Sequence, residues 1–257
     1  MMIADTRAAV VEALRAQIAV AARHGRGSSR ASAVPFGIAA IDRQLPAGGL
    51  LLGAVHELQA SGPDVEVGAA PALFAAGVLA RRPGPVVWIG RSGGVFAHGL
   101  LQAGLDPRRV VFVDAGKAVL LAMEEALRHP DIAGAVCELE GKLDLVVSRR
   151  LQLAAEGSQV LGFLIRRSRR FNDPAFDQPS AAMTRWRIGT VPSPPVLSHA
   201  PDTPVLHRPL WRLELLRCRG GEGASWIVES ADAQGRLAVA AVLADRPAAP
   251  AQRRAAG

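Results

Sequence analysis

Four arginines occur within five consecutive positions of the chain, at Arg166, Arg167, Arg169 and Arg170. They follow the apolar run Val160–Ile165, which predicts a buried strand. Side chains just beyond the carboxyl end of a parallel strand lie where parallel sheets bind ligands. Guanidinium groups make bidentate contacts with phosphates and carboxylates. The run therefore predicts a surface for single-stranded DNA or a partner protein, and a solvated loop is the alternative interpretation.

A second arrangement of cations surrounds an aromatic ring, because Arg185 and Arg187 flank Trp186. An aromatic ring between two cations suits a stacked base or a contact in a protein interface. The alternative is an edge strand whose Trp packs inward. Both interpretations remain open from the sequence alone.

The segment between residues 59 and 77 follows a strand-like run and precedes a helical pattern, as a phosphate-binding loop would. Such a loop needs backbone N–H donors, a Lys for the β- and γ-phosphates and a hydroxyl for Mg²⁺. The segment contains no Lys and no Arg, and it carries two carboxylates. The residues in the position of the loop are Ser61, Gly62, Asp64 and Glu66. We expect a degenerate loop that binds no nucleotide and no cofactor.

Other catalytic or metal-binding patterns are missing from the sequence. No Ser is framed as Gly-x-Ser-x-Gly after a strand, and no His has metal-ligand spacing to a Cys. Cys137 and Cys218 each fall in a predicted strand, which favours buried thiols over a disulfide or a metal site. We expect neither a metal nor catalysis.

The elements that must position these side chains alternate between strands and helices. Strands are predicted at Ala54–Leu58, Val86–Ile89, Val110–Val113, Ala133–Leu139 and Val160–Ile165. Helices are predicted at Ala69–Ala80, Val95–Ala103, Ala118–Arg128 and Leu143–Ala155. Apolar strands separated by helices indicate a mainly parallel sheet covered on both faces. Four further runs alternate in polarity and predict antiparallel strands at one edge: Thr184–Thr190, Trp211–Arg217, Ser225–Glu229 and Arg236–Val242.

The chain divides into three parts. Residues 1–33 predict an amphipathic helix and a flexible linker, residues 34–244 the α/β domain, and residues 245–257 a disordered basic tail. The helix packs on its own core or docks on a neighbouring subunit. A Pro-rich loop is predicted at Val191–Pro209. No apolar run reaches the roughly 18 residues of a membrane span, and the first residues do not resemble a signal peptide, so we expect a cytoplasmic protein with no membrane contact.

Residues 36–58, FGIAAIDRQLPAGGLLLGAVHEL, resemble the opening of the RecA family. The matching positions are Gly37, Ile41, Asp42, Leu45, Gly48, Gly49, Leu50, Gly53, Val55 and Glu57. Three later stretches resemble the ImuA family, whose members are RecA-like accessory proteins of a bacterial mutagenic repair cassette. These stretches are RRLQLAAEGSQVLGFLIR at 149–166, AAMTRWRI at 181–188 and WRLELLRCRGG at 211–221. Together the resemblance covers about Val34 to Leu243.

The resemblance implies a RecA-like three-layer core with a degenerate phosphate loop. Active RecA-family members carry a carboxylate after the second core strand, where this chain has Arg91. Their magnesium-side strand usually ends in Asp, where this chain has Glu138 and Glu140. Either glutamate could bind a metal ion, but without a phosphate loop there is no bound nucleotide for that ion to contact. The resemblance therefore implies a protein that is not an enzyme.

The resemblance also implies partners. They are the Y-family-like polymerase homologue of the same cassette, RecA and, through these, an error-prone replicative-type polymerase in SOS-induced translesion synthesis. A net charge of +7 is compatible with an acidic partner or with single-stranded DNA. Three alternatives stay open: a SulA-type inhibitor of cell division, a RecA-family ATPase with an atypical site, and a stand-alone protein that binds single-stranded DNA.

Overall fold

The computed structural model describes residues 33–91, 96–171, 173–192 and 208–240. The predicted N-terminal helix, the predicted tail and most of the predicted Pro-rich loop lie outside these ranges. The described residues form an α/β fold around one large mixed sheet. The predicted fold class is therefore confirmed.

The large sheet has nine strands in the order β11-β10-β9-β8-β3-β7-β6-β4-β5. Its strands are β3 (Ala54–Ala60), β4 (Val86–Ile89), β5 (Val110–Val113), β6 (Gly134–Glu140), β7 (Leu161–Arg167), β8 (Thr184–Val191), β9 (Leu210–Cys218), β10 (Ala224–Glu229) and β11 (Ala238–Val239). The five pairs β8-β3, β3-β7, β7-β6, β6-β4 and β4-β5 are parallel. The three pairs β8-β9, β9-β10 and β10-β11 are antiparallel. Every predicted strand is present. The shifts at the ends are small except for the run predicted at Arg236–Val242, where β11 comprises only Ala238–Val239 among the described residues.

The direction of β8 corrects one prediction. The run Thr184–Thr190 was expected to be antiparallel, but β8 pairs in parallel with β3, from His56 opposite Thr184 to Ala60 opposite Ile188. Strand β3 lies between β7 and β8, so the chain crosses over β3 and returns to the same end of the sheet. The antiparallel edge therefore begins with the pairing of β8 and β9.

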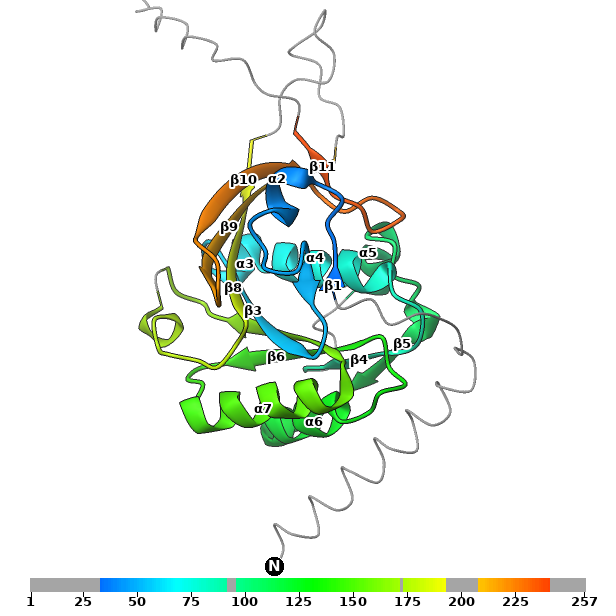
Figure 1. Ribbon diagram of the computed structural model, residues 1–257, viewed down its shortest axis with the longest axis vertical. Coiled ribbons are helices and arrows are strands. Elements are labelled where there is room, and N and C mark those ends of the chain that lie inside the picture. The colour runs from blue at the N-terminus through cyan, green and yellow to red at the C-terminus, as the bar shows by residue number, and fades with distance from the viewer. Residues whose placement is uncertain (1–32, 92–95, 172, 193–207, 241–257) are drawn as a thin grey trace, which may run out of the picture.

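Helices cover both faces of the sheet, as Figure 1 shows. Helices α4 (Ala69–Ala80) and α5 (Ala97–Gln102) lie on one face, and α6 (Val119–Leu127) and α7 (Leu145–Ser158) lie on the other. The shorter elements are α2 (Ala39–Asp42), α3 (Asp64–Val67), the strand pair β1 (Ala33–Val34) and β2 (Leu50–Leu51), and the 3-10 turns Pro107–Arg109, Gly116–Ala118 and Pro174–Phe176. Within the described ranges, no helix is both long and apolar enough to span a membrane.

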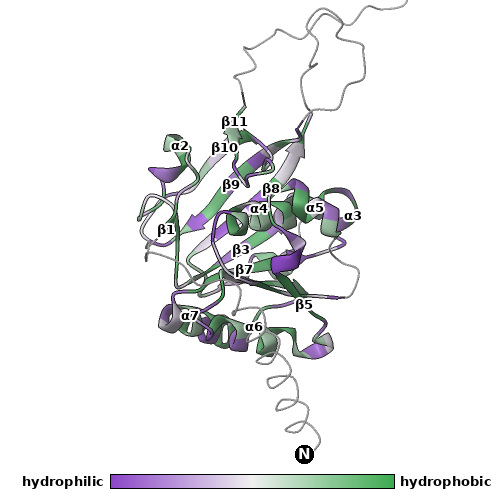
Figure 2. Cartoon of the chain, turned by 90° about the vertical axis from the view of Figure 1, so that its right-hand side faces the viewer, coloured by the Kyte–Doolittle hydropathy of each residue, from purple (hydrophilic) through white to green (hydrophobic). Residues whose placement is uncertain are grey.

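Helix α4 is buried on nearly every side, since nine of its twelve residues are buried. Strands β8, β9 and β10 curl around it while β3 passes beneath it (Figure 1). A helix enclosed in this way is apolar around its whole circumference. Its close packing also requires glycine at position 77, because a Cβ there would lie 2.6 Å from the Cβ of Ala231. Figure 2 shows the same arrangement from the side, with apolar segments in the central strands and in α4.

The stretch that resembles the RecA family begins with a tight turn and continues into β3. Gly37 has a φ of +78°, which favours glycine, and the Asp42 carboxylate accepts the N–H groups of Phe36 at 2.7 Å and Gly37 at 2.9 Å. His56 on β3 is fully buried between the Thr184 hydroxyl at 2.7 Å and the Leu51 carbonyl at 3.0 Å. Gly37, Asp42 and His56 therefore fix the backbone that leads into β3, and their role in the motif is structural.

Candidate functional site

A cleft of about 1020 Å³ opens at the carboxyl ends of the parallel strands. Residues after four strand ends line one side of it, at Arg91 after β4, Lys117 after β5, Glu138 to Gly141 at β6 and Arg167 to Arg170 at β7. Residues of α3, α4 and α5 line the other side. Parallel sheets bind their ligands at this end of the strands, so the cleft is the candidate site.

The loop between β3 and α4 closes one side of the cleft. It is wound into the single turn α3, in which the N–H groups of Glu66 and Val67 donate to the carbonyl of Pro63 and that of Gly68 donates to Asp64. The Asp64 N–H donates to the carbonyl of Ser168. Phosphate loops bind anions with free backbone N–H groups, and these four are already used within the protein.

Arg167 crosses the floor of the cleft and joins the loop to the strands. Its Nε donates to Glu138 at 3.1 Å, its guanidinium lies 3.7 Å from the Asp64 carboxylate, and it also donates to the carbonyl of Gly68. The second Glu138 oxygen accepts the indole N–H of Trp88 at 2.9 Å. The side chains of Arg167 and Glu138 are only 13% and 11% exposed, so this network is shielded from water.

Partial burial raises the pKa of Asp64, and the attraction of Arg167 opposes that rise. The Asp64 carboxylate is stabilised by the positive charge of Arg167, and it would repel a phosphate bound at the same place. In the described part of the chain, no three His, Cys, Asp or Glu side chains come together as a metal group.

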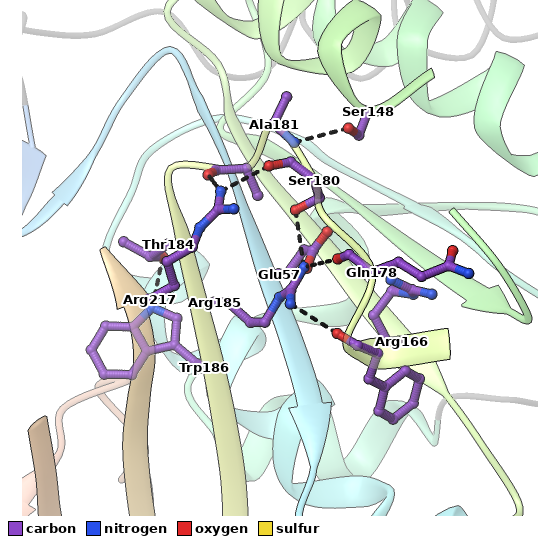
Figure 3. Close-up of polar contacts among 12 residues, drawn as sticks. Glu57, Ser148, Arg166, Gln178, Ser180, Ala181, Thr184, Arg185, Trp186 and Arg217 are labelled. Carbon is purple, nitrogen blue, oxygen red and sulfur yellow. Dashed lines mark hydrogen bonds and ion pairs between the residues drawn. The ribbon is translucent and has the colours of Figure 1, made fainter. Parts of the chain in front are cut away.

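A second polar cluster lies inside the protein, where side chains of β7, β3, β8 and β9 meet the connection between β7 and β8 (Figure 3). The Nε of Arg185 donates to the Glu57 carboxylate at 2.7 Å, and the side chain of Glu57 is only 2% exposed. The two remaining nitrogens of Arg185 donate to the carbonyls of Phe176 at 2.8 Å and Gln178 at 2.7 Å. Arg217, on the neighbouring strand β9, donates to the carbonyls of Ser180 and Ala182.

Arg166 completes this cluster from the side of β7. It is 2% exposed, and its guanidinium donates to the carbonyls of Gly141 at 2.7 Å and Ala175 at 3.2 Å. Its charge also lies over the ring of Phe176, at 5.4 Å from the ring centre. We call Glu57, Arg166, Arg185 and Arg217 the arginine clamp, because together they hold the connection between β7 and β8 to the sheet.

Comparison with known proteins assigns the family. The chain is 40% identical over 208 residues to a curated protein named ImuA in two strains of Caulobacter vibrioides, across 77% of this chain and 83% of the relative. It belongs to the ImuA family. No protein-family model matches the chain. Among solved structures it is similar to the RadB recombinase, with a TM-score of 0.55 and 16% identity over 81% of this chain and all of that one, a likeness that concerns the fold alone.

The residues predicted to bind DNA or a partner separate into two groups in this ImuA-family protein. Arg166, Arg185 and Trp186 face the interior, and Arg167 lies in the floor of the cleft. Arg166 and Arg185 are covered because the connection between β7 and β8 supplies carbonyls that accept from their guanidinium groups. Whether any of these residues contacts DNA or a partner stays a prediction. Three of the predicted residues remain more exposed: Arg169, Arg170 and Arg187.

Trp186 corrects the prediction of a stacking surface most clearly. Its side chain is fully buried against Phe36, Phe74 and Trp226, with ring centres 5.8 to 6.1 Å apart. Its indole N–H donates to the Thr184 hydroxyl at 2.8 Å. The ring therefore belongs to the core around α4, as the alternative interpretation of the sequence had it.

Sequence reasoning missed three residues that the ImuA-family fold places at the cleft or in the clamp. Lys117 and Phe96 line the cleft, and Arg217 belongs to the clamp. Lys117 follows the apolar run Val110–Val113 by a few positions, so the rule that ligands bind beyond strand ends would have found it. Nothing local distinguishes Arg217, whose role depends on carbonyls about 35 residues away in sequence.

Proposed function

We propose that this ImuA-family protein is a non-catalytic RecA-like adaptor in damage-induced mutagenesis. It acts by binding protein partners, and it neither holds nor hydrolyses a nucleotide. Membership of the ImuA family and the RecA-like fold support the setting. The partners are the Y-family-like polymerase homologue of the same cassette and RecA, and through them an error-prone replicative-type polymerase.

One observation carries the non-catalytic part of the proposal. The loop at the start of α4 uses four N–H groups internally, and Arg167 pairs with both Asp64 and Glu138 in the floor of the cleft. A triphosphate would need these N–H groups and would meet the Asp64 carboxylate. The position after β4 holds Arg91 instead of a carboxylate that would orient an attacking water. Each of these features acts against nucleotide turnover.

Thermal unfolding with Mg-ATP tests the absence of a nucleotide site. A ligand at a hundredfold excess over its Kd stabilises a protein by about 2.7 kcal/mol, which raises the melting temperature of a chain of this size by roughly 5 to 10 °C. We expect no rise for this protein, with RecA measured beside it as the positive control. A clear rise, or turnover above a blank, would contradict the proposal and favour an atypical ATPase.

Capture of purified proteins tests the adaptor role. The immobilised full-length protein is offered the purified polymerase homologue of the cassette, RecA and the division GTPase FtsZ in separate reactions. We expect capture of the polymerase homologue or RecA. Capture of FtsZ alone would support a SulA-type inhibitor, and capture of none of the three would refute the adaptor role.

A further inference from the structure

The strand side of the cleft carries four exposed cations. The described residues form no hydrogen bond or ion pair with the charged groups of four exposed cations there, namely Arg91, Lys117, Arg169 and Arg170. These cations come from the ends of three strands, so they are spread along the opening. Such a distribution favours an extended anionic ligand over a single compact anion.

The acids of the cleft are mostly engaged elsewhere. Asp64 and Glu138 pair with Arg167. Asp173 accepts the Ala175 N–H at 2.9 Å and the Ser168 hydroxyl at 2.7 Å, and these hydrogen bonds, with a smaller attraction from Arg170, lower its pKa, so it keeps its negative charge. Only Glu140 lines the cleft without such a contact among the described residues. The charged lining residues are five cations and four carboxylates, so the net charge of the cleft is +1, and the exposed cations lie on its strand side.

The part of the cleft wall formed by α4, α5 and Phe96 is apolar. It consists of aliphatic and small side chains with one aromatic ring at the rim: Ala69, Ala72 and Leu73 of α4, Leu100 of α5, and Phe96. Phe96 is 73% exposed and stacks on His98, with ring centres 4.9 Å apart. An apolar wall beside a cavity lets a ligand bury a bulky apolar side chain.

We propose that this cleft binds an acidic segment of a partner protein, whose carboxylates contact the four cations while a bulky apolar side chain packs against α4, α5 and Phe96. The inference rests on the proposed adaptor function and specifies where a partner docks. A single nucleic-acid strand fits less well. Its bases would need flat aromatic platforms, and among the described lining residues Phe96 is the only aromatic one.

Peptide selection on the full-length protein tests the inference. A phage library of random peptides of about twelve residues, long enough in extended form to span such a cleft, is selected on the immobilised protein. We expect enriched peptides to combine several Asp or Glu with a Phe, Trp or Leu. Synthetic labelled copies are then titrated by fluorescence anisotropy against wild type and two variants of equal charge change.

The first variant reverses the cleft cations: Arg91→Glu, Lys117→Glu, Arg169→Glu and Arg170→Glu. The matched control reverses four exposed arginines that do not line the cleft: Arg43→Glu, Arg149→Glu, Arg212→Glu and Arg219→Glu. We expect the cleft variant to bind the peptide at least roughly tenfold more weakly than the control variant, since close charge pairs contribute more than net charge. A separate Phe96→Ala variant should also weaken binding.

Four results would overturn the inference. Enrichment of neutral or basic peptides would do so, and so would equal binding by the two charge-reversal variants. Tight binding of an oligo-dT strand that the cleft variant alone loses, without peptide binding, would assign the cleft to nucleic acid. If the cleft variant still captures the purified cassette partner as well as wild type does, docking lies elsewhere and the adaptor function stands. If wild type captures no partner, the adaptor function itself fails.

Discussion

The arginine clamp gives the most quantitative prediction about this protein. The change Glu57→Gln keeps the shape of the side chain but removes the charge that Arg185 faces at 2.7 Å. The two side chains are 2% and 12% exposed, so water does not replace the lost partner. Removing one member of a buried ion pair costs about 3–5 kcal/mol. That is a large share of the roughly 5–15 kcal/mol that stabilises a typical domain.

Strand β8 carries a matched control two residues further along. Arg187 pairs with Glu214 of β9 at 3.6 Å, and these side chains are 39% and 29% exposed. Because an exposed pair contributes only about 0–1 kcal/mol, Glu214→Gln should lower the free energy of unfolding by no more than that. The two substitutions are chemically identical, so the comparison isolates the effect of burial.

Urea unfolding followed by tryptophan fluorescence measures both changes. The fluorescence reports on the core directly, since Trp88, Trp186 and Trp211 are all buried. We expect the Glu57→Gln midpoint to fall far below that of Glu214→Gln at an unchanged slope. Equal losses for the two variants, or a loss below about 1 kcal/mol for Glu57→Gln, would refute the view that the clamp is a buried electrostatic unit.

Three further predictions concern a buried histidine and two glycines. Burial lowers the pKa of His56 from 6.5 to about 4, so folding favours the neutral ring. Its contribution to stability is complete above pH 6.5 and is lost as the pH falls through about 4. Between pH 7 and pH 4, the free energy of unfolding should therefore fall by an amount approaching about 3 kcal/mol. The variant His56→Gln should lack this fall, whereas the control His98→Gln, changed at an exposed position, should show it. Gly134→Ala places a Cβ 2.7 Å from the Leu161 carbonyl and against Leu79, and overpacking should lower the free energy of unfolding by about 1–3 kcal/mol. Gly157→Ala in α7 meets nothing within 4 Å and should raise it by about 0.4–1 kcal/mol in the same assay.

The sequence alone determined the order and most of the bounds of the central elements. Strands β4 and β5 and helix α4 begin and end at the predicted residues. Their signals are local, because apolar runs of strand length end at Gly, Pro or charged residues, and the helix has a compact run of small apolar side chains. The resemblance to the RecA and ImuA families depends on the same kind of contiguous pattern.

Only the tertiary structure decided which basic side chains face outward. Arg166 and Arg167 are neighbours on one strand, so their side chains point to opposite faces, yet both end up engaged. Arg166 is held by carbonyls of Gly141 and Ala175, which belong to connections on either side of it in the chain. The position of those carbonyls depends on how the connections fold over the strand ends, and no local pattern around residue 166 contains that information.

The closed loop beside the cleft was likewise decided by packing across the sheet. The missing Lys and the two carboxylates of residues 59–77 are visible in the sequence. That Asp64 donates its N–H to Ser168 and shares Arg167 with Glu138 is not, because these partners come from β6 and from the end of β7. Parallel strands that are far apart along the chain place their carboxyl ends together, and only their register brings these side chains within contact distance.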